Sequence, residues 1–336
     1  MKIVSDPWPT GEWRRQLAAA VRDLGELLSL LELDAEALGV DATSSATRRF
    51  PLRVSRGFIA RMRRGDPDDP LLRQVLPMPV EDDEVAGFTT NPVGELSLVR
   101  GDGLLSKYHG RALLVTTGAC AVHCRYCFRR HFPYDEQRPD DRGFAPALEA
   151  IVVDPTIQEV ILSGGDPLLL PDDRLAALAG DIASIPHVRR LRIHTRLPVV
   201  LPERVDEALV EWLAACRLPV VIVIHVNHPQ EIDVNVIRAL TALEAAGATL
   251  LNQAVLLRGI NDSSDVLAEL STRLFECGVL PYYLHLLDRV AGAAHFEVDE
   301  DRAREIMGDL QARLPGYLVP KLVREVEGAP SKISVK

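Results

Sequence analysis

The sequence has no apolar run long enough to cross a bilayer. Its longest apolar runs, such as residues 218–226, have the length of a strand, whereas a membrane-spanning helix needs roughly 18 to 20 apolar residues. Residues 1–16 lack the apolar segment of a secretory signal. Positive charge is not in excess either, because the formal net charge is -10, and this disfavours broad nucleic-acid binding. We therefore expect a cytoplasmic protein that binds neither membranes nor nucleic acid.

Cysteine is scarce, with five residues in the whole chain, and the odd number argues against a disulfide framework. Three of them share one Cys-x3-Cys-x2-Cys motif: Cys120, Cys124 and Cys127. Three thiolates on a short loop can bind zinc, with His123 or His131 as a fourth ligand. They can also bind three irons of a 4Fe-4S cluster and leave the fourth iron open to an outside ligand. Cys216 and Cys277 lie in helical patterns, where cysteine behaves as a small apolar residue.

Acidic residues are absent from residues 104–134, although the chain as a whole is acidic. The same stretch carries several cationic side chains: Lys107, Arg111, Arg125, Arg129 and Arg130. Such a stretch is either a basic surface stripe or the lining of a pocket that holds an anion. The anion could be a phosphate, a carboxylate or a cluster with thiolate ligands.

Residues 1–100 are predicted to form a helical N-terminal region. Residues 10–33 carry apolar residues at helical spacing, with Thr10 as the helix N-cap. A second helix is expected near residues 55–65, ended by Gly65.

From Arg111 onward, strand-length apolar runs alternate with helical patterns. The runs are mostly continuously apolar, as is typical of parallel strands covered on both faces: residues 112–117, 159–164, 190–195, 219–226, 249–257 and 280–287. These β-α units are too few for the closed eight-stranded barrel. We therefore predict an α/β fold, a partial (β/α)6 TIM-like barrel over residues 101–315, followed by a short C-terminal segment over residues 316–336.

Polar residues stand where the predicted strands end. The cysteine motif follows the first strand, and the later ends carry further polar groups: residues 163–166, His194 to Arg196, His225, Asn227, His228 and Asp288. In β/α barrels, functional residues gather at the carboxyl ends of the strands. One shared site is therefore expected there.

A Cys-x3-Cys-x2-Cys motif after the first strand of such a barrel resembles the radical S-adenosylmethionine (SAM) superfamily. Tyr126, just before the last cysteine, matches that pattern. So does Ser163-Gly164-Gly165-Asp166 after the second strand, where the backbone of this motif would bind the amino group of SAM. The resemblance implies a 4Fe-4S cluster whose open iron binds SAM, and one-electron cleavage of SAM to a 5′-deoxyadenosyl radical.

Longer motifs resemble one family within that superfamily, the lysine 2,3-aminomutases. The motifs are CRYCFRRHF (124–132), LLNQAVLLRGIND (250–262), PYYLHLLD (281–288) and GYLVPKLVREVEGAPSK (316–332). The similarity is strongest to short-chain members that make β-lysine for the modification of elongation factor P. It implies an isomerase that moves the α-amino group of L-lysine to C3, with pyridoxal 5′-phosphate (PLP) as a further cofactor.

The family resemblance assigns the cofactor-binding residues. Lys332, in the GAPSK motif, would form the Schiff base with PLP. The other assignments place Lys107, Tyr108 and Arg111 at the PLP phosphate, Gln253 and His225 near SAM and PLP, and Thr195 with Arg196 at the SAM ribose or carboxylate. Lys107 stands where other members have an arginine, which changes the geometry of one phosphate contact.

The same resemblance assigns the substrate contacts. Arg129 would bind the α-carboxylate of lysine, and Asp288 and Glu325 would bind its side-chain ammonium group. Glu325 replaces an aspartate of the family and is one methylene longer.

The sequence ends four residues after Lys332, whereas free-lysine mutases carry a longer extension with zinc-binding cysteines. This favours the elongation factor P branch, in which a separate ligase uses the β-lysine, and a flavodoxin or ferredoxin would supply electrons. Two alternatives remain: a mutase for free lysine or another amino acid such as glutamate, and a non-enzymatic zinc-binding scaffold. The acids Asp288 and Glu325 disfavour glutamate, because like charges repel.

Overall fold

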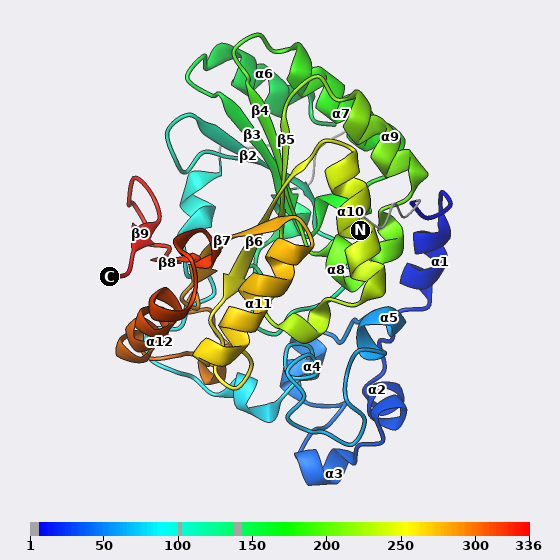
Figure 1. Cartoon of the computed structure of the whole chain (residues 1–336), viewed down its shortest axis with the longest axis vertical. Coiled ribbons are helices and arrows are strands. Elements are labelled where there is room, and N and C mark those ends of the chain that lie inside the picture. Colours follow the sequence, from blue (N-terminus) through cyan, green and yellow to red (C-terminus); the bar gives the residue numbers. More distant parts are fainter. Residues whose placement is uncertain (1–6, 100–102, 138–142) are drawn as a thin grey trace.

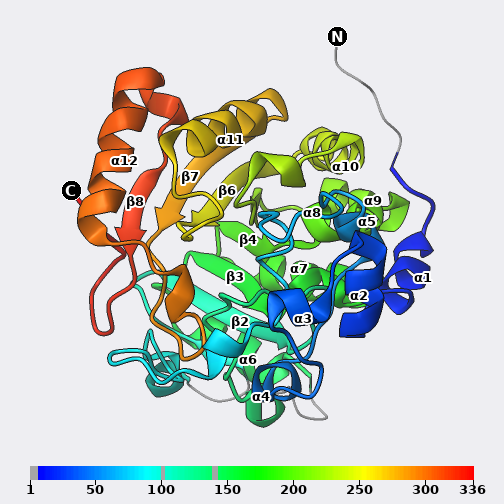
Figure 2. The ribbon, with the colours of Figure 1, turned by 90° about the horizontal axis from the view of Figure 1, so that it is seen from below.

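The computed structural model describes residues 7–99, 103–137 and 143–336, and its core is one curved sheet of parallel strands. The six predicted strands are all present: β2 (Arg111–Thr117), β3 (Glu159–Gly164), β4 (Arg190–Thr195), β5 (Val220–Ile224), β6 (Thr249–Val255) and β7 (Val279–His285). They pair in chain order and in parallel. The predicted partial barrel is therefore confirmed (Figures 1 and 2).

The sheet extends beyond the prediction at both edges. β8 (Lys321–Arg324) pairs in parallel with β7, and β9 (Ile333–Ser334) returns antiparallel to β8. At the other edge, β1 (Leu104–Leu105) is antiparallel to β2. These strands have two to four residues, which is too short for an apolar run to reveal them.

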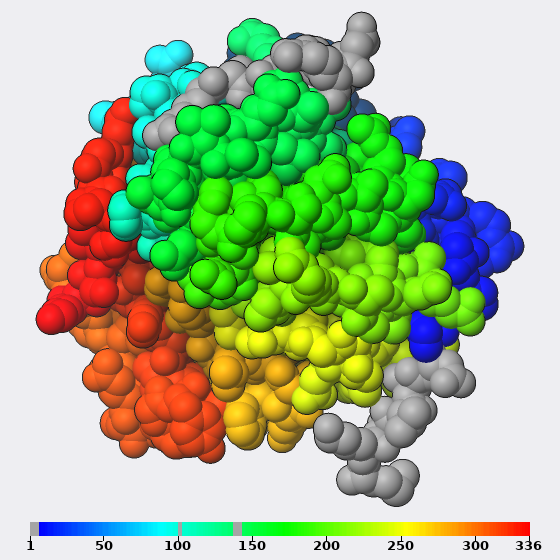
Figure 3. Space-filling model, turned by 90° about the horizontal axis from the view of Figure 1, so that it is seen from above, coloured from blue at the N-terminus to red at the C-terminus, as the bar shows by residue number. Residues whose placement is uncertain are grey.

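Helices cover the outer face of the sheet, as Figure 2 shows. They follow the strands in sequence: α6 (Ala145–Val153), α7 (Asp172–Ser184), α9 (Glu207–Ala215), α10 (Val234–Ala245), α11 (Ser264–Glu276) and α12 (Glu300–Arg313). The short α8 (Leu197–Val200) lies instead beyond the carboxyl ends of the strands, where Val200 lines a cavity. Figure 3 shows this part of the chain in successive bands from green to orange, with the N-terminal residues at one side and the C-terminal residues at the other. Within the described residues, no helix combines the length and apolar character needed to cross a membrane.

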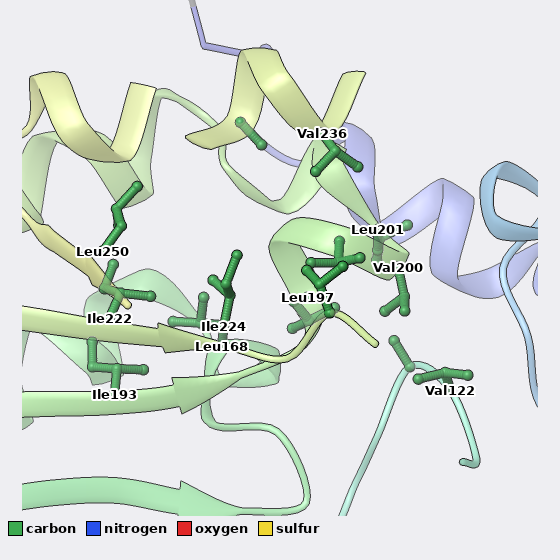
Figure 4. Close-up of a cluster of buried hydrophobic side chains, with 14 of the residues drawn as sticks. Val122, Leu168, Ile193, Leu197, Val200, Leu201, Ile222, Ile224, Val236 and Leu250 are labelled. Carbon is green, nitrogen blue, oxygen red and sulfur yellow. The ribbon is translucent and has the colours of Figure 1, made fainter. Parts of the chain in front are cut away.

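Fully buried aliphatic side chains join the strands to these helices (Figure 4). Ile193, Ile222 and Leu250 from three neighbouring strands lie in this cluster, and each is at most 2% exposed. Burying one such side chain contributes about 1.5 to 3 kcal/mol. Val122, between the first two cysteines of the motif, is buried in the same cluster. The cysteine loop is therefore attached to the core of the barrel.

The N-terminal region consists of short helices: α1 (Glu12–Ala18), α2 (Leu24–Leu31), α3 (Ala35–Leu38), α4 (Ser45–Arg49) and α5 (Arg56–Ile59). The expectation of one helix over residues 10–33 is wrong. Its first half begins after Gly11, which has a left-handed φ of 88°, and not after Thr10. This helix ends at Ala18, Val21 then pairs with Val54, and Asp23 caps α2 by accepting a hydrogen bond from Glu26 N.

The second expected helix is also shorter than predicted, since α5 ends at Ile59 and turns continue to Gly65. Helices α2 to α5 lie together at the lower end of the molecule in Figure 1. The buried residues of α2 and α5 belong to the same hydrophobic cluster as the barrel.

Candidate active site

One cavity of about 370 Å³ opens at the carboxyl ends of the strands. Every site residue predicted from the sequence lines it: Lys107, Tyr108, Arg111, Cys120, Cys124, Tyr126, Cys127, Arg129, Ser163, Gly164, Gly165, Asp166, Thr195, Arg196, His225, Gln253, Asp288, Glu325 and Lys332. The cysteine motif and Lys332 are more than 200 residues apart in the sequence, and the fold brings them to one cavity. Each residue's role stays a prediction, and the contacts below bear on it.

The N-terminal region holds the cysteine loop in place. His123 N donates to Arg53 O at 3.0 Å, and Arg125 N donates to Gln74 O at 2.9 Å. The His123 ring stacks on Phe50 with ring centroids 4.9 Å apart. The N-terminal region therefore builds one wall of the site.

Buried arginines of the same loop are anchored to Glu81 of the 3-10 helix η1 (Pro79–Asp82). Arg125 donates to Glu81 through Nε at 2.8 Å and Nη2 at 2.5 Å, and Arg130 Nη2 donates at 2.7 Å. Since the Arg125 and Glu81 side chains are fully buried, separating them would leave a charge unpaired in the interior. The basic stretch is therefore not a surface stripe.

The three thiols have the chemistry of metal ligands. Burial raises the pKa of Cys120 well above its usual value, and the neighbouring Cys127 raises it further. Burial, with the charge of Cys124, also raises the pKa of Cys127 to about 11. Such thiols become thiolates when a positively charged iron centre binds them. Three soft sulfur donors around one cavity fit a 4Fe-4S cluster.

The histidines considered as a fourth zinc ligand each have one ring nitrogen near a backbone carbonyl oxygen. His123 Nδ1 lies 2.7 Å from Pro51 O, and His131 Nε2 lies 3.1 Å from Ala291 O. Among the residues that the structure describes, no three His, Cys, Asp or Glu side chains are arranged around a single metal ion.

The glycines of the Ser-Gly-Gly-Asp motif allow the second strand end to touch the cysteine loop. Gly165 N donates to Thr117 O at 2.7 Å, and Asp166 N donates to Ala119 O at 2.8 Å. A Cβ on Gly165 would lie 2.2 Å from Ala119 O, and Gly164 has a φ of 124°. Both positions therefore require glycine.

Asp166 ties this strand end to the next. It accepts hydrogen bonds from Thr195 Oγ1 at 2.7 Å and from Arg196 N at 2.8 Å. Burial raises its pKa to about 6, although these hydrogen bonds favour the carboxylate. Asp166 thus positions the loop after β4 against the loop after β3.

Arg129 has a partner that the sequence did not reveal, Glu95 of η2 (Glu95–Leu98). Glu95 accepts from Arg129 Nε and Nη2, each at 2.7 Å. Arg129 Nη1 donates to Ser163 Oγ at 2.9 Å and to Gly164 O at 3.3 Å. Burial alone would lower the pKa of Arg129, but Glu95 outweighs it and the pKa is raised. Among the described residues, these partners leave one N–H of Nη2 for a ligand.

Lys332 lies at the end of the turn between β8 and β9, where it meets Glu325. Lys332 Nζ and Tyr108 Oη both donate to the Glu325 carboxylate, and Lys107 Nζ lies 2.6 Å from Glu325 Oε2. Burial lowers the pKa of Lys332, against the opposing charge of Glu325. Burial would raise the pKa of Glu325, but Lys332 and the hydrogen bonds lower it to about 2. Glu325 therefore contacts three residues assigned to PLP and also lines the cavity.

Asp288, just beyond β7, is the second acid assigned to the substrate ammonium group. Burial, together with the charge of Glu325, raises its pKa to about 7, although Lys332 and Lys107 oppose this. A cation that enters the cavity would therefore favour loss of the Asp288 proton and formation of the carboxylate.

Three histidines at or just after the ends of β4, β5 and β7 line the cavity: His194, His225 and His285. The Nε2 atom of each is buried without a hydrogen-bond partner among the described residues. Burial lowers the pKa of all three, that of His225 to about 4, so the rings are neutral near pH 7. His194 and His225 were both expected at the shared site, and His225 alone was assigned near SAM and PLP, whereas His285 was not predicted. A histidine ending an apolar strand was the signal available for His285.

Comparison with known proteins agrees with this geometry. Residues 114–270 match the Radical SAM superfamily. The fold and the site thus define a radical SAM enzyme, a class in which a 4Fe-4S cluster and SAM act together.

Curated relatives identify the family within this superfamily. An L-lysine 2,3-aminomutase of Escherichia coli is 52% identical over 321 residues, with 96% of this chain and 93% of the relative covered. One of Haemophilus influenzae is 46% identical, with 95% and 94% covered, and one of Clostridium subterminale is 34% identical, with 99% and 80% covered. The chain belongs to the L-lysine 2,3-aminomutase family, which confirms the resemblance seen in its motifs.

Proposed function

We propose that this protein is a PLP-dependent radical SAM enzyme that converts L-lysine to β-lysine. The observation that carries the proposal is the shared cavity, in which the cysteine motif and Lys332 both lie with groups of either charge. Lysine has one carboxylate and two amino groups. The cavity offers Arg129 for the carboxylate, PLP held by Lys332 for the α-amino group, and Asp288 with Glu325 for the side-chain ammonium group.

The donor set of the cavity fits the cofactors. Cys120, Cys124 and Cys127 would hold the cluster, and Lys332 would hold PLP. The other predicted residues would serve the PLP phosphate and SAM: Lys107, Tyr108, Arg111, Tyr126, the Ser163 to Asp166 motif, Thr195, Arg196, His225 and Gln253. When bound, SAM and the reduced cluster supply a 5′-deoxyadenosyl radical, and PLP supplies a conjugated ring for the migrating nitrogen.

The chain's own residues prepare the cofactor and bind the substrate. The lowered pKa of Lys332 enlarges the neutral fraction of its amine, which is the form that condenses with an aldehyde. Glu95 fixes the Arg129 guanidinium at the carboxylate end of the cavity. The buried acid Asp288 binds a side-chain ammonium group more strongly than an exposed acid would, because water screens the pair less.

The wider role follows the short-chain branch of the family. We propose that the β-lysine modifies elongation factor P through a separate ligase, in the cytoplasm, and that a flavodoxin or ferredoxin reduces the cluster. The division into residues 1–100, 101–315 and 316–336 also stays a prediction.

The test is anaerobic reconstitution with iron, sulfide, PLP and SAM, followed by incubation with single amino acids. We expect β-lysine from L-lysine by mass spectrometry and no β-isomer from glutamate. A β-isomer of another amino acid, without β-lysine, would favour the alternative substrate. Colourless protein with about one zinc and almost no iron would instead support the zinc-scaffold alternative.

The pH dependence of kcat/KM tests Asp288. Its carboxylate form attracts the ammonium group, and its pKa of about 7 lies above the usual value. The favourable charge is therefore present above about pH 7 and is lost as the pH falls below it. We expect kcat/KM for lysine to rise with pH up to about 7 and then level off, as the free-enzyme pKa dictates.

In Asp288→Asn this rise should disappear, and kcat/KM should fall on the order of 100-fold, because a buried charge partner is lost. Asp309→Asn on the exposed face of α12 is the matched control and should keep the wild-type profile. An unchanged profile in Asp288→Asn would assign the ionisation to another group.

A further inference from the structure

A buried arginine after β4 contacts one of the three motif cysteines. Arg196 Nη1 lies 2.7 Å from Cys124 Sγ. Its Nη2 lies 2.5 Å from Gln74 Oε1 and 3.0 Å from Glu231 Oε2. Arg196 is 5% exposed, and the Glu231 side chain is fully buried. A fixed positive charge therefore stands directly against a predicted cluster ligand, with a fixed negative charge behind it.

A closed hydrogen-bond network holds this pair. Glu231 Oε1 accepts from Asn227 N at 2.9 Å and from Gln74 Nε2 at 3.1 Å. Arg196 N donates to Asp166, and the guanidinium lies over the ring faces of Phe58 and Tyr126. Withdrawing Arg196 would leave the buried Glu231 carboxylate without this ion-pair partner, which is strongly unfavourable. The network therefore holds the Arg196 side chain against Cys124.

We infer that Arg196 is a positioning residue that raises the reduction potential of the cluster through Cys124, and that Glu231 limits this effect. The inference rests on the proposed function, in which Cys120, Cys124 and Cys127 carry the 4Fe-4S cluster. It adds a role that the predicted contact of Arg196 with SAM does not include.

The sign follows from charge. Reduction adds one electron to the cluster, supplied by a one-electron donor, so the reduced cluster is more negative than the oxidised one. A nearby cation and a hydrogen bond to a ligand sulfur both stabilise the more negative form and raise the potential. A nearby carboxylate destabilises that form and lowers the potential. Arg196 and Glu231 therefore act in opposite directions on one quantity.

The experiment is a redox titration of the anaerobically reconstituted protein, followed by electron paramagnetic resonance, without SAM or lysine. Sodium dithionite is the reductant. We expect Arg196→Gln to lower the midpoint potential and Glu231→Gln to raise it. Arg196→Lys should lower it less than Arg196→Gln, because lysine keeps the charge without the planar fork that reaches both partners. Opposite shifts are not expected from general loosening of the protein.

Arg204→Gln is the matched control. Arg204 is also fully buried and ion-paired, but its partners include Leu168 O, Asp172 and Asp206. It should leave the potential unchanged. Shifts of the same sign, or none, in Arg196→Gln and Glu231→Gln would overturn the inference.

If Arg196→Gln does not retain the cluster, Glu231→Gln and Arg196→Lys decide, since they must still shift the potential in opposite directions. Wild-type protein that binds no iron would contradict the proposed function instead. The two failures are therefore distinguishable.

Discussion

Replacing Lys332 with alanine is expected to remove PLP absorbance and to lower mutase activity by at least about 1,000-fold, the order seen when a covalent catalytic group is lost. Lys332 is the lysine that the structure places in the cavity with a lowered pKa and a carboxylate partner, Glu325. Iron content should stay at the wild-type level, because the cysteine loop is held by the N-terminal region and not by the C-terminal turn. The measurements are the visible spectrum, bound iron and the β-lysine assay.

Lys321→Ala is the control for this variant. Lys321 lies on the neighbouring strand β8, and its side chain is exposed. It should retain PLP, iron and activity. Full activity in Lys332→Ala would remove the PLP assignment, even if the cluster were present.

Replacing any one motif cysteine with alanine is expected to remove most of the bound iron and to reduce activity to background, again by at least about 1,000-fold. The reason is that a cluster held by two thiolates has lost one of its three protein ligands. Iron and sulfide content and the cluster absorbance are the measurements. PLP binding at Lys332 should survive in part, because Lys332 is positioned by the turn between β8 and β9 and not by the cysteine loop.

Cys216→Ala and Cys277→Ala are the matched controls. Both cysteines are half-buried at the ends of outer helices, after α9 and α11, and both variants should retain iron and activity. Iron that persists in the Cys120, Cys124 and Cys127 variants would exclude this motif as the cluster site.

The cavity is built from ion pairs whose members come from distant parts of the chain. Arg129 pairs with Glu95, Lys332 with Glu325, and Arg196 with Glu231. Each cation carries a predicted role, whereas Glu95 and Glu231 were not recognised in the sequence. Pairing keeps each cation charged despite its burial, because an opposite charge offsets the loss of hydration. The cationic side chains of the site therefore stay charged, and their paired carboxylates limit the non-specific binding of anions.

Much of the barrel could be predicted from local patterns. The six longer strands could be predicted from their apolar runs, and the polar residues at their ends indicated where the site would lie. The N-terminal region was predicted less accurately. Helical spacing over residues 10–33 does not show that the helix is interrupted where Val21 pairs with Val54.

The sequence by itself determined the chemistry of this protein: three thiols at a spacing suited to an iron-sulfur cluster, a glycine pair that lets two strand ends meet, and a lysine in a family motif. These are local patterns, and each depends on neighbouring residues. Only the tertiary structure decided which groups oppose them. Glu95 and His285 line the cavity, and Glu231 and Gln74 contact its Arg196, because the fold brings distant segments together at one end of the barrel. Burial there makes a charge depend on a partner that local sequence does not identify.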